Sequence, residues 1–320
     1  MKTINKLKED LRSARIYLFD FKNDRKYTSL ISDVYDNQEK LLSSLVVAAH
    51  TIEKGLTMPH KRIPFGEPKA IEIINNCAEY VKRGYDVSES RFIDVIGIME
   101  EYKDVMGEAV SSRFKDSLNG LLNYIPHEIQ LTQKYSINRE EYFSHIDDDF
   151  VTFSRSRCSC RNLPGHVNKE ALKRALALSM NAPSTCNRQS HRVHLLQTEE
   201  SKKTILSIQS GNRGFGDIAD QFILVTSDLR CWPSKHQRNA PYVDGGIYIM
   251  NLLYCLHHEK IAACTLNLYL DENRTNKMHE ELGIPDNEVP IALVAIGIPP
   301  ESFDLARSHR RSCDEIITCH

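Results

Sequence analysis

The sequence predicts a mixed α+β protein in which a helical N-terminal region precedes a core of helices layered on a sheet. Apolar residues recur every three or four positions through the first 150 residues, as on one face of a helix. After residue 150, helix-like segments alternate with short apolar segments typical of strands. We therefore expect a helical region over residues 1–150 and a second domain over residues 151–320. A length of 320 residues agrees, because a typical domain has about 150 residues.

Four helices are expected in the first region, in the following order. Apolar residues at helical spacing predict a helix over 41–56, with Gly55 near its end as a stop signal. Pro68 suits the first turn of the next helix, and Gly84 is placed to end it. Two further helices are expected over 92–102 and 110–122.

The second region is expected to carry a sheet layered with helices, in an α/β or α+β structure. Its apolar segments alternate between helical spacing and short strand-like runs bounded by polar residues. The predicted helices cover 167–180 and 244–258, and the predicted strands cover 191–197, 222–227, 262–270 and 290–298.

Composition excludes several classes of protein. Apolar residues make up 41% and charged residues 26%, which is ordinary for a globular chain. The formal charge is -2, so a polybasic surface for nucleic acid or anionic lipid is not expected. The N-terminus is charged without an apolar segment, and no apolar run could span a bilayer, so we expect a cytoplasmic protein. Nine scattered cysteines without a CxxC pair suit reduced thiols.

Two polar clusters could carry chemistry. Residues 154–161, Ser-Arg-Ser-Arg-Cys-Ser-Cys-Arg, suit an anion such as phosphate, although a solvated basic connection between domains is equally consistent with them. Residues 181–189 contain ordinary turn formers, but the amides of Asn187 and Gln189 could also read the edge of a heterocycle. The glycines of residues 211–216 have the wrong order for a dinucleotide-binding fingerprint.

Structural roles are expected for three weaker candidate sites. Cys158 and Cys160 could form a thiol pair, but two cysteines do not complete a tetrahedral metal site, so no metal is expected. Adjacent His257 and His258 point in different directions on a helix, so we expect one to be packed and the other solvated. His50 and Glu53 could bind a ligand together, or Glu53 could pair with Lys54 or Arg62.

Taken in order, four elements of the chain resemble the FMN-dependent nitroreductase family. They are an Arg-x-Ser-x-Arg element, an Ala-Pro-Ser-x-x-Asn-x-Gln element, Asp244-Gly245-Gly246 at the start of an apolar helix, and an arginine pair after a Val-Ala-Ile-Gly strand. The resemblance covers about residues 150–320 and implies a three-layer α+β core with a mainly antiparallel central sheet flanked by helices. The segment His-Thr-Ile-Glu-Lys-Gly-Leu at 50–56 resembles nitroreductase-like proteins linked to bacterial polysaccharide gene clusters.

The resemblance implies a set of FMN-binding residues. Arg157 and Ser159 would meet the phosphate and ribityl chain, with Cys158 where the family commonly has a basic residue, and Arg161 would lie near flavin N1 and O2. Strand residues Leu266 and Asn267 would lie beside N5, although Asn267-Leu268-Tyr269 departs from the family by adding bulk there. A segment that reaches the ring from the neighbouring subunit would supply Pro183, Ser184, Thr185, Asn187 and Gln189. The arginine pair near the phosphate would be Arg310 and Arg311.

The implied function is that of a homodimeric oxidoreductase. Hydride would pass from NADH or NADPH through flavin N5 to a small organic acceptor, such as a nitro compound, a quinone or a biosynthetic intermediate. The flavin would perform the chemistry, so no catalytic side chain is required. An alternative is a flavin-binding module with little turnover whose helical region docks a partner protein. A flavin-free metal or thiol protein is a third hypothesis.

Overall fold

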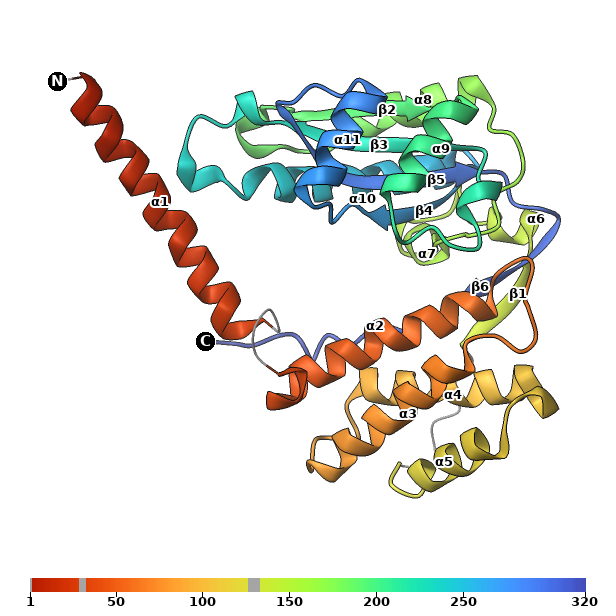
Figure 1. Ribbon diagram of the computed structural model, residues 1–320. Coiled ribbons are helices and arrows are strands. Elements are labelled where there is room, and N and C mark those ends of the chain that lie inside the picture. The colour runs from red at the N-terminus through yellow and green to blue at the C-terminus, as the bar shows by residue number, and fades with distance from the viewer. Residues whose placement is uncertain (1, 29–32, 126–132) are drawn as a thin grey trace. The chain divides into compact units, whose positions relative to one another are not determined.

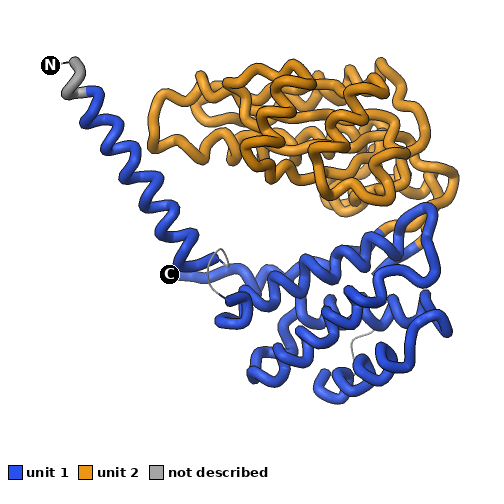
Figure 2. The backbone as a smooth tube through the Cα atoms, in the orientation of Figure 1, with its two compact units in different colours: residues 1–135, 306–320 blue, residues 136–305 orange. Residues whose placement is uncertain are grey.

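The computed structural model describes residues 2–28, 33–125 and 133–320, with side chains from residue 6 onward. The chain divides into two compact units (Figure 2). Unit 1 contains Met1–Tyr135 and Ala306–His320, and unit 2 contains Ser136–Leu305. Residues 136–150 are thus part of unit 2, and the last 15 residues are part of unit 1, whereas the sequence suggested one boundary near residue 150.

Unit 1 is helical, as predicted (Figure 1). The four expected helices are present, and their apolar faces share one core that contains Leu42, Ile74, Phe92 and Phe114. Another helix, which was not predicted from the sequence, precedes them over residues Lys2–Tyr27. The helices are α1 (Lys2–Tyr27), α2 (Gln38–Leu56), α3 (Glu67–Lys82), α4 (Ser90–Met106) and α5 (Ser112–Leu122), with short 3-10 turns η1 (Val34–Asp36) and η2 (Gly107–Ala109).

Pro68, Gly84 and Gly55 lie near the helix ends that they were predicted to mark. Pro68 lies in the first turn of α3, and Gly84 follows its end with a φ of +71°. Helix α2 ends at Leu56, as predicted, although Gly55 lies within its last turn and not after it. A Cβ at Gly55 would lie 2.2 Å from the ring of Phe65, so this glycine serves close packing of that ring on the helix.

The C-terminal segment is held on unit 1 by hydrogen bonds. Strand β6 (Ser302–Ala306) pairs with β1 (Lys134–Asn138), and the next residue, Arg307, donates its backbone N–H to the Gln133 carbonyl at 2.8 Å. Ser308 then donates from its backbone nitrogen and its hydroxyl to Oε1 of Glu53, at 2.9 and 3.0 Å. The burial of Glu53 makes these bonds important, because a buried carboxylate needs donors.

Unit 2 is built on a four-stranded antiparallel sheet in the order β2-β3-β5-β4. All four strands were predicted, although β4 ends at Asn267 and not at Leu270. The register pairs His191 with Ser227 across the first two strands. The strands are β2 (His191–Leu196), β3 (Gln221–Asp228), β4 (Ala262–Asn267) and β5 (Glu288–Gly297).

Helices cover both faces of this sheet, which confirms the three-layer α+β prediction (Figure 1). α8 (Lys169–Ser179) and α10 (Ala240–His258) pack on the face that carries Ile223 and Val294. α9 (Glu199–Ile208) and α11 (Glu272–Leu282), which were not predicted, cover the other face. The remaining elements are α6 (Arg139–Tyr142), α7 (Phe150–Ser156) and the 3-10 turns η3 (Thr185–Asn187), η4 (Gly216–Ile218), η5 (Leu229–Cys231) and η6 (Lys235–Gln237).

No helix within the described ranges of the chain combines the length and the apolar character that crossing a bilayer requires.

Candidate functional site

The arginine-rich segment 157–161 follows directly from the end of α7. Its chain leaves the helix at Arg157, where φ and ψ are −71° and 115°. Cys160 donates its backbone N–H to the carbonyl of Ala263 in β4 at 3.1 Å. The segment is thereby fixed beside the strand that ends in Leu266 and Asn267, so two of the regions predicted to bind FMN adjoin each other in unit 2.

Two arginines of this segment carry buried donors that lack a protein acceptor. The Nε atoms of Arg157 and Arg161 are inaccessible to solvent, and neither has a hydrogen-bond partner among the described residues. The Arg161 residue as a whole is only 9% exposed. Because an unsatisfied buried N–H is costly, such donors point to an acceptor supplied by a ligand. An anionic or carbonyl-bearing ligand fits this donor set.

His257 packs beside the same segment from the last turn of α10. Its Nε2 lies 3.0 Å from Ser156 Oγ, and its ring meets the edge of Tyr142 with ring centres 5.1 Å apart. Burial lowers the pKa of His257 to about 4, and the nearby charge of Arg157 adds to the effect. The imidazole is therefore neutral at pH 7 and packed, whereas His258 is exposed, as expected for adjacent histidines on a helix.

The second predicted segment forms a constrained loop around η3. Cys186, Asn187 and Gln189 have φ values of 52°, 55° and 50°, which non-glycine residues adopt rarely. The carboxylate of buried Asp244 holds the loop, because it accepts bonds from the Thr185 backbone N–H at 2.9 Å and from the Thr185 hydroxyl at 2.7 Å. Backbone in this region persists only where its surroundings enforce it, and it concentrates at binding sites.

The polar atoms of this loop are partly committed to one another. The backbone N–H of Gln189 donates to Ser184 Oγ at 3.0 Å, and its side-chain amide donates to Asn187 Oδ1 at 3.0 Å. The side chains of Pro183, Asn187 and Gln189 are exposed. The loop forms a turn between α8 and β2, and it also exposes the amides of Asn187 and Gln189. The interpretation as a turn and the interpretation as a set of exposed amides each describe part of it.

Within one chain, the arginine segment and the constrained loop lie at opposite ends of α10. The loop is bonded to Asp244 near the start of the helix, and the arginine segment adjoins His257 in its last turn. These two anchor residues are 13 positions apart, which corresponds to about 20 Å along the helix. One copy of unit 2 therefore does not bring the two predicted halves of the site together.

The α10 helix between these ends presents apolar side chains to solvent. Tyr242, Val243, Ile247 and Met250 are all exposed on it. Phe150 of α7 extends the patch, since its ring centre lies 6.1 Å from that of Tyr254. A contiguous exposed apolar surface of this kind is typical of an interaction surface.

At the end of β4, the residues that were expected to add bulk beside the flavin lie in different environments. Leu268 is buried, whereas Tyr269 is 85% exposed. Leu266 is also buried, and the carbonyl of Asn267 accepts a bond from Gln209 Nε2 at 3.2 Å. The tyrosine ring is thus directed to solvent and not into the interior of unit 2.

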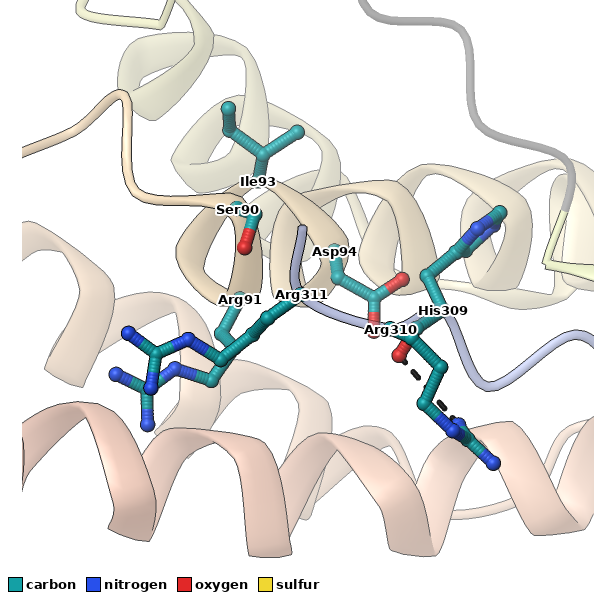
Figure 3. A pocket seen from close by; sticks show the side chains of 7 residues that line it. All are labelled: Ser90, Arg91, Ile93, Asp94, His309, Arg310 and Arg311. Carbon is teal, nitrogen blue, oxygen red and sulfur yellow. Dashed lines mark hydrogen bonds between the residues drawn. The ribbon is translucent and has the colours of Figure 1, made fainter. Parts of the chain in front are cut away.

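Arg310 and Arg311 lie in unit 1, apart in the chain division from the other predicted ligands of FMN. They line a pocket of about 250 Å³ at the start of α4 (Figure 3). Carboxylates offset part of its positive charge, because Arg91 donates to Glu39 at 2.7 and 2.8 Å and Arg311 lies 3.9 Å from Glu89. The other lining residues are Ser90, Ile93, Asp94 and His309.

The weaker candidates have structural explanations. Glu53 lies 2.7 Å from His50 Nδ1, and its other oxygen binds Ser308, so this pair anchors the C-terminal segment. Burial raises the pKa of the Cys160 thiol to about 12, which disfavours the reactive thiolate. Among the described residues, no group of three or more His, Cys, Asp or Glu is arranged to hold a metal ion.

Comparison with known families adds to this geometry. Residues 155–298 match the model of the Nitroreductase family. These residues form a nitroreductase-family domain. The matched range begins in α7 and ends just after β5, so it covers the arginine segment, the constrained loop and the whole sheet.

The nitroreductase-family domain is also similar to solved structures. One is a nitroreductase family protein from Clostridium difficile 630, with 25% identity and a TM-score of 0.45, covering 53% of this chain and 97% of that one. Another is described as a nitroreductase in complex with FMN from Exiguobacterium sibiricum 255-15, with 19% identity and a TM-score of 0.44, covering 54% and 97% of the two chains. No curated protein sequence matches the chain.

Proposed function

We propose that this protein is an FMN-dependent oxidoreductase that transfers hydride from NADH or NADPH to a small organic acceptor. The observation that carries the proposal is the pair of buried, unpartnered Nε donors on Arg157 and Arg161, within a domain of the nitroreductase family. When bound, FMN would supply the two-electron chemistry, and the protein would supply binding, orientation and electrostatics. No catalytic side chain is needed for that division of roles.

The arginine segment is proposed to hold the cofactor from one side. Arg157, Cys158 and Ser159 would surround the phosphate and ribityl chain, because a guanidinium fork and a hydroxyl suit phosphate oxygens. Arg161 would place its charge near the pyrimidine edge of the flavin. Leu266 and Asn267, at the end of the adjoining strand, would line the N5 side. The role of Arg310 and Arg311 at the phosphate stays a prediction.

We further propose that the complete site forms in a homodimer. The two predicted halves of the site are about 20 Å apart along α10, so a second copy is the natural source of the missing half. An antiparallel pairing of the exposed apolar faces of two α10 helices would bring Asp244 of one copy toward His257 of the other. The constrained loop would then reach the partner's cofactor through Pro183, Ser184, Thr185, Asn187 and Gln189. Two-fold symmetry would form two such sites in each dimer.

The first test is the colour and reactivity of the purified chain. We expect a yellow protein whose ligand has the mass of FMN and whose absorbance bleaches when NADH or NADPH is added without oxygen. Bound flavin that stays oxidised would instead support the flavin-binding module. A colourless protein that does not take up FMN would reject both hypotheses, and stoichiometric zinc would then favour the metal or thiol protein.

A second test separates dimerisation from folding. Ile247→Asp places a charge in the exposed face of α10, and we expect it to weaken the dimer in sedimentation velocity and to lose FMN. Val47→Asp is a matched control, because Val47 is an exposed aliphatic residue on the helix α2 of unit 1. The circular dichroism of both variants should be unchanged. An Ile247→Asp variant that dimerises as strongly as the unaltered chain and keeps its FMN would contradict the proposed interface.

A further inference from the structure

Helix α1 carries a narrow apolar stripe with the spacing of a coiled coil. Leu7, Leu11, Ala14, Leu18 and Phe21 follow one another at intervals of four, three, four and three residues. In heptad terms, Leu11 and Leu18 are a positions, and the other three are d positions. The next two seam positions hold Arg25 and Thr28, so the apolar stripe ends at Phe21. Apolar residues at successive a and d positions are typical of a two-helix seam. Ile16, Tyr17 and Phe19 lie outside this seam.

The side chains of this seam are exposed in the single chain. Leu7, Leu11, Leu18 and Phe21 are 61%, 59%, 50% and 48% exposed. Tyr17 and Phe19 are also exposed outside the seam, at 57% and 62%, and a helix whose apolar side chains are uncovered gains little stability by itself. Burying this stripe against a partner would remove the exposed apolar surface.

Charges beside the seam specify which partner and which orientation fit. The e positions hold Lys8, Arg15 and Lys22, and the g positions hold Asp10, Tyr17 and Asp24. In an antiparallel pair of identical helices, e positions face e positions, so basic side chains would oppose one another. In a parallel pair, each g position faces the e position five residues later on the partner. Asp10 of each chain would then face Arg15 of the partner subunit, so the pair would occur twice.

We propose that α1 forms a parallel two-stranded coiled coil with α1 of a second copy of this chain. The spacing of the seam selects a helical partner, and the separation of acidic and basic flanks selects an identical helix in parallel orientation. A parallel pair also fits the two-fold symmetry of common homodimers. A seam of about two heptads forms a weak dimer when free, but any second contact between the same two chains raises the effective concentration of the helices.

This coiled coil is separate from the α10 interface and does not depend on flavin. It gives α1 a role in joining chains, and α1 contains none of the residues predicted to bind FMN. Failure of the coiled coil would leave FMN binding intact, and failure of the proposed function would leave the coiled coil intact. Flavin absorbance and contact between α1 helices are therefore read separately in the test.

Cysteine cross-linking in the full chain tests the seam. Leu11→Cys places a thiol at an a position, and Phe19→Cys places one at a similarly exposed position outside the seam, since Phe19 is 62% exposed. Under mild oxidation, we expect Leu11→Cys to give at least fivefold more disulfide-linked dimer than Phe19→Cys. The unmodified chain measures the background from its own nine cysteines. Equal yields from the two variants would overturn the proposal.

Orientation is tested by mixing and by charge reversal. An equimolar mixture of Leu7→Cys and Phe21→Cys chains should give no mixed disulfide, because these positions are far apart in a parallel pair; a dominant mixed disulfide would overturn the parallel arrangement. In the Leu11→Cys background, Asp10→Arg or Arg15→Asp alone should lower the cross-linking yield by about threefold, and the two changes together should restore it. Loss without restoration would overturn the charge pairing.

A lipid surface is the competing occupant of an amphipathic helix, and the same variants detect it. Vesicles of phosphatidylcholine with phosphatidylserine are pelleted with the unmodified chain and with Leu11→Asp. We expect the chain to remain in the supernatant. Binding to vesicles that Leu11→Asp abolishes, together with no cross-link from Leu11→Cys, would assign the stripe to membranes and overturn the coiled coil.

Discussion

Ser156 and His257 join the end of α7 to the last turn of α10, with Ser156 Oγ lying 3.0 Å from His257 Nε2. The serine hydroxyl also donates to the carbonyl of Phe153 at 2.8 Å, so the imidazole must supply the proton of the bond between them. This assigns the proton of neutral His257 to Nε2. The arginine segment begins at the next residue, Arg157, and its starting point is fixed by this bond.

Acid stability should depend on His257. Its folded pKa of about 4 lies below the ordinary value of 6.5, because burial opposes its protonation. The unfolded chain therefore binds the proton first, and stability present above pH 6.5 is lost as the pH falls toward 4, by about 3 kcal/mol. Urea unfolding of His257→Phe across this range should show a correspondingly weaker dependence on pH. An unchanged slope would show that another group dominates.

Removing the Arg157 guanidinium should weaken FMN retention. A hydrogen bond to a charged group contributes about 1.5–3 kcal/mol, which corresponds to a Kd that rises between about tenfold and somewhat more than a hundredfold in Arg157→Ala. Fluorescence titration with free FMN measures the change. Arg155→Ala is the matched control, because Arg155 is exposed on α7 and should leave the Kd unaltered. Equal loss in both variants would point to a general charge effect.

Arg161 should tune the redox potential of bound flavin. Two-electron reduction leaves negative charge around N1, and a fixed cation nearby favours the reduced form. We therefore expect Arg161→Ala to lower the midpoint potential in a xanthine oxidase titration with a reference dye. Arg161→Lys keeps the positive charge and should lower the potential much less. A potential that is the same in Arg161→Ala and the unaltered protein would remove this residue from the flavin edge.

Two helical glycines of unit 1 should respond in opposite ways to alanine. Gly55→Ala places a Cβ against the ring of Phe65, which is itself packed edge-to-face on Tyr102, and should destabilise the protein by about 1–3 kcal/mol. Gly120 on α5 has no atom within 4 Å of its missing Cβ, so Gly120→Ala should stabilise by about 0.5–1 kcal/mol. Thermal unfolding distinguishes them; a stabilising Gly55→Ala would mean that the ring of Phe65 moves freely.

Elements with strong local patterns could be predicted from the sequence. Apolar residues at helical spacing defined α2 to α5, and alternating or continuous apolar runs defined the four strands of the sheet. The polar helices α9 and α11 escaped prediction because each buries few apolar side chains. Helix α1 escaped because charged residues are frequent along it and its apolar residues do not gather on one broad face.

The segments of the candidate site could be named from the sequence, but their arrangement in space could not. The Arg-x-Ser-x-Arg and Ala-Pro-Ser elements identified residues 157–161 and 183–189, which both lie in unit 2. Their separation along α10 depends on bonds between residues distant in sequence, Thr185 with Asp244 and Ser156 with His257. The inclusion of Arg310 and Arg311 in unit 1 depends likewise on the bond between Glu53 and Ser308. No local pattern specifies such partners.

The bond between Glu53 and Ser308 has a consequence for the order in which the chain matures. Its two residues are 255 positions apart, so α2 is synthesised long before the segment that satisfies its buried carboxylate. During translation, most of unit 2 is synthesised before Ser308, and domains fold as units as they emerge. Unit 1 therefore begins to form first and is completed last, and a chain that stops short of Ser308 leaves Glu53 without these donors.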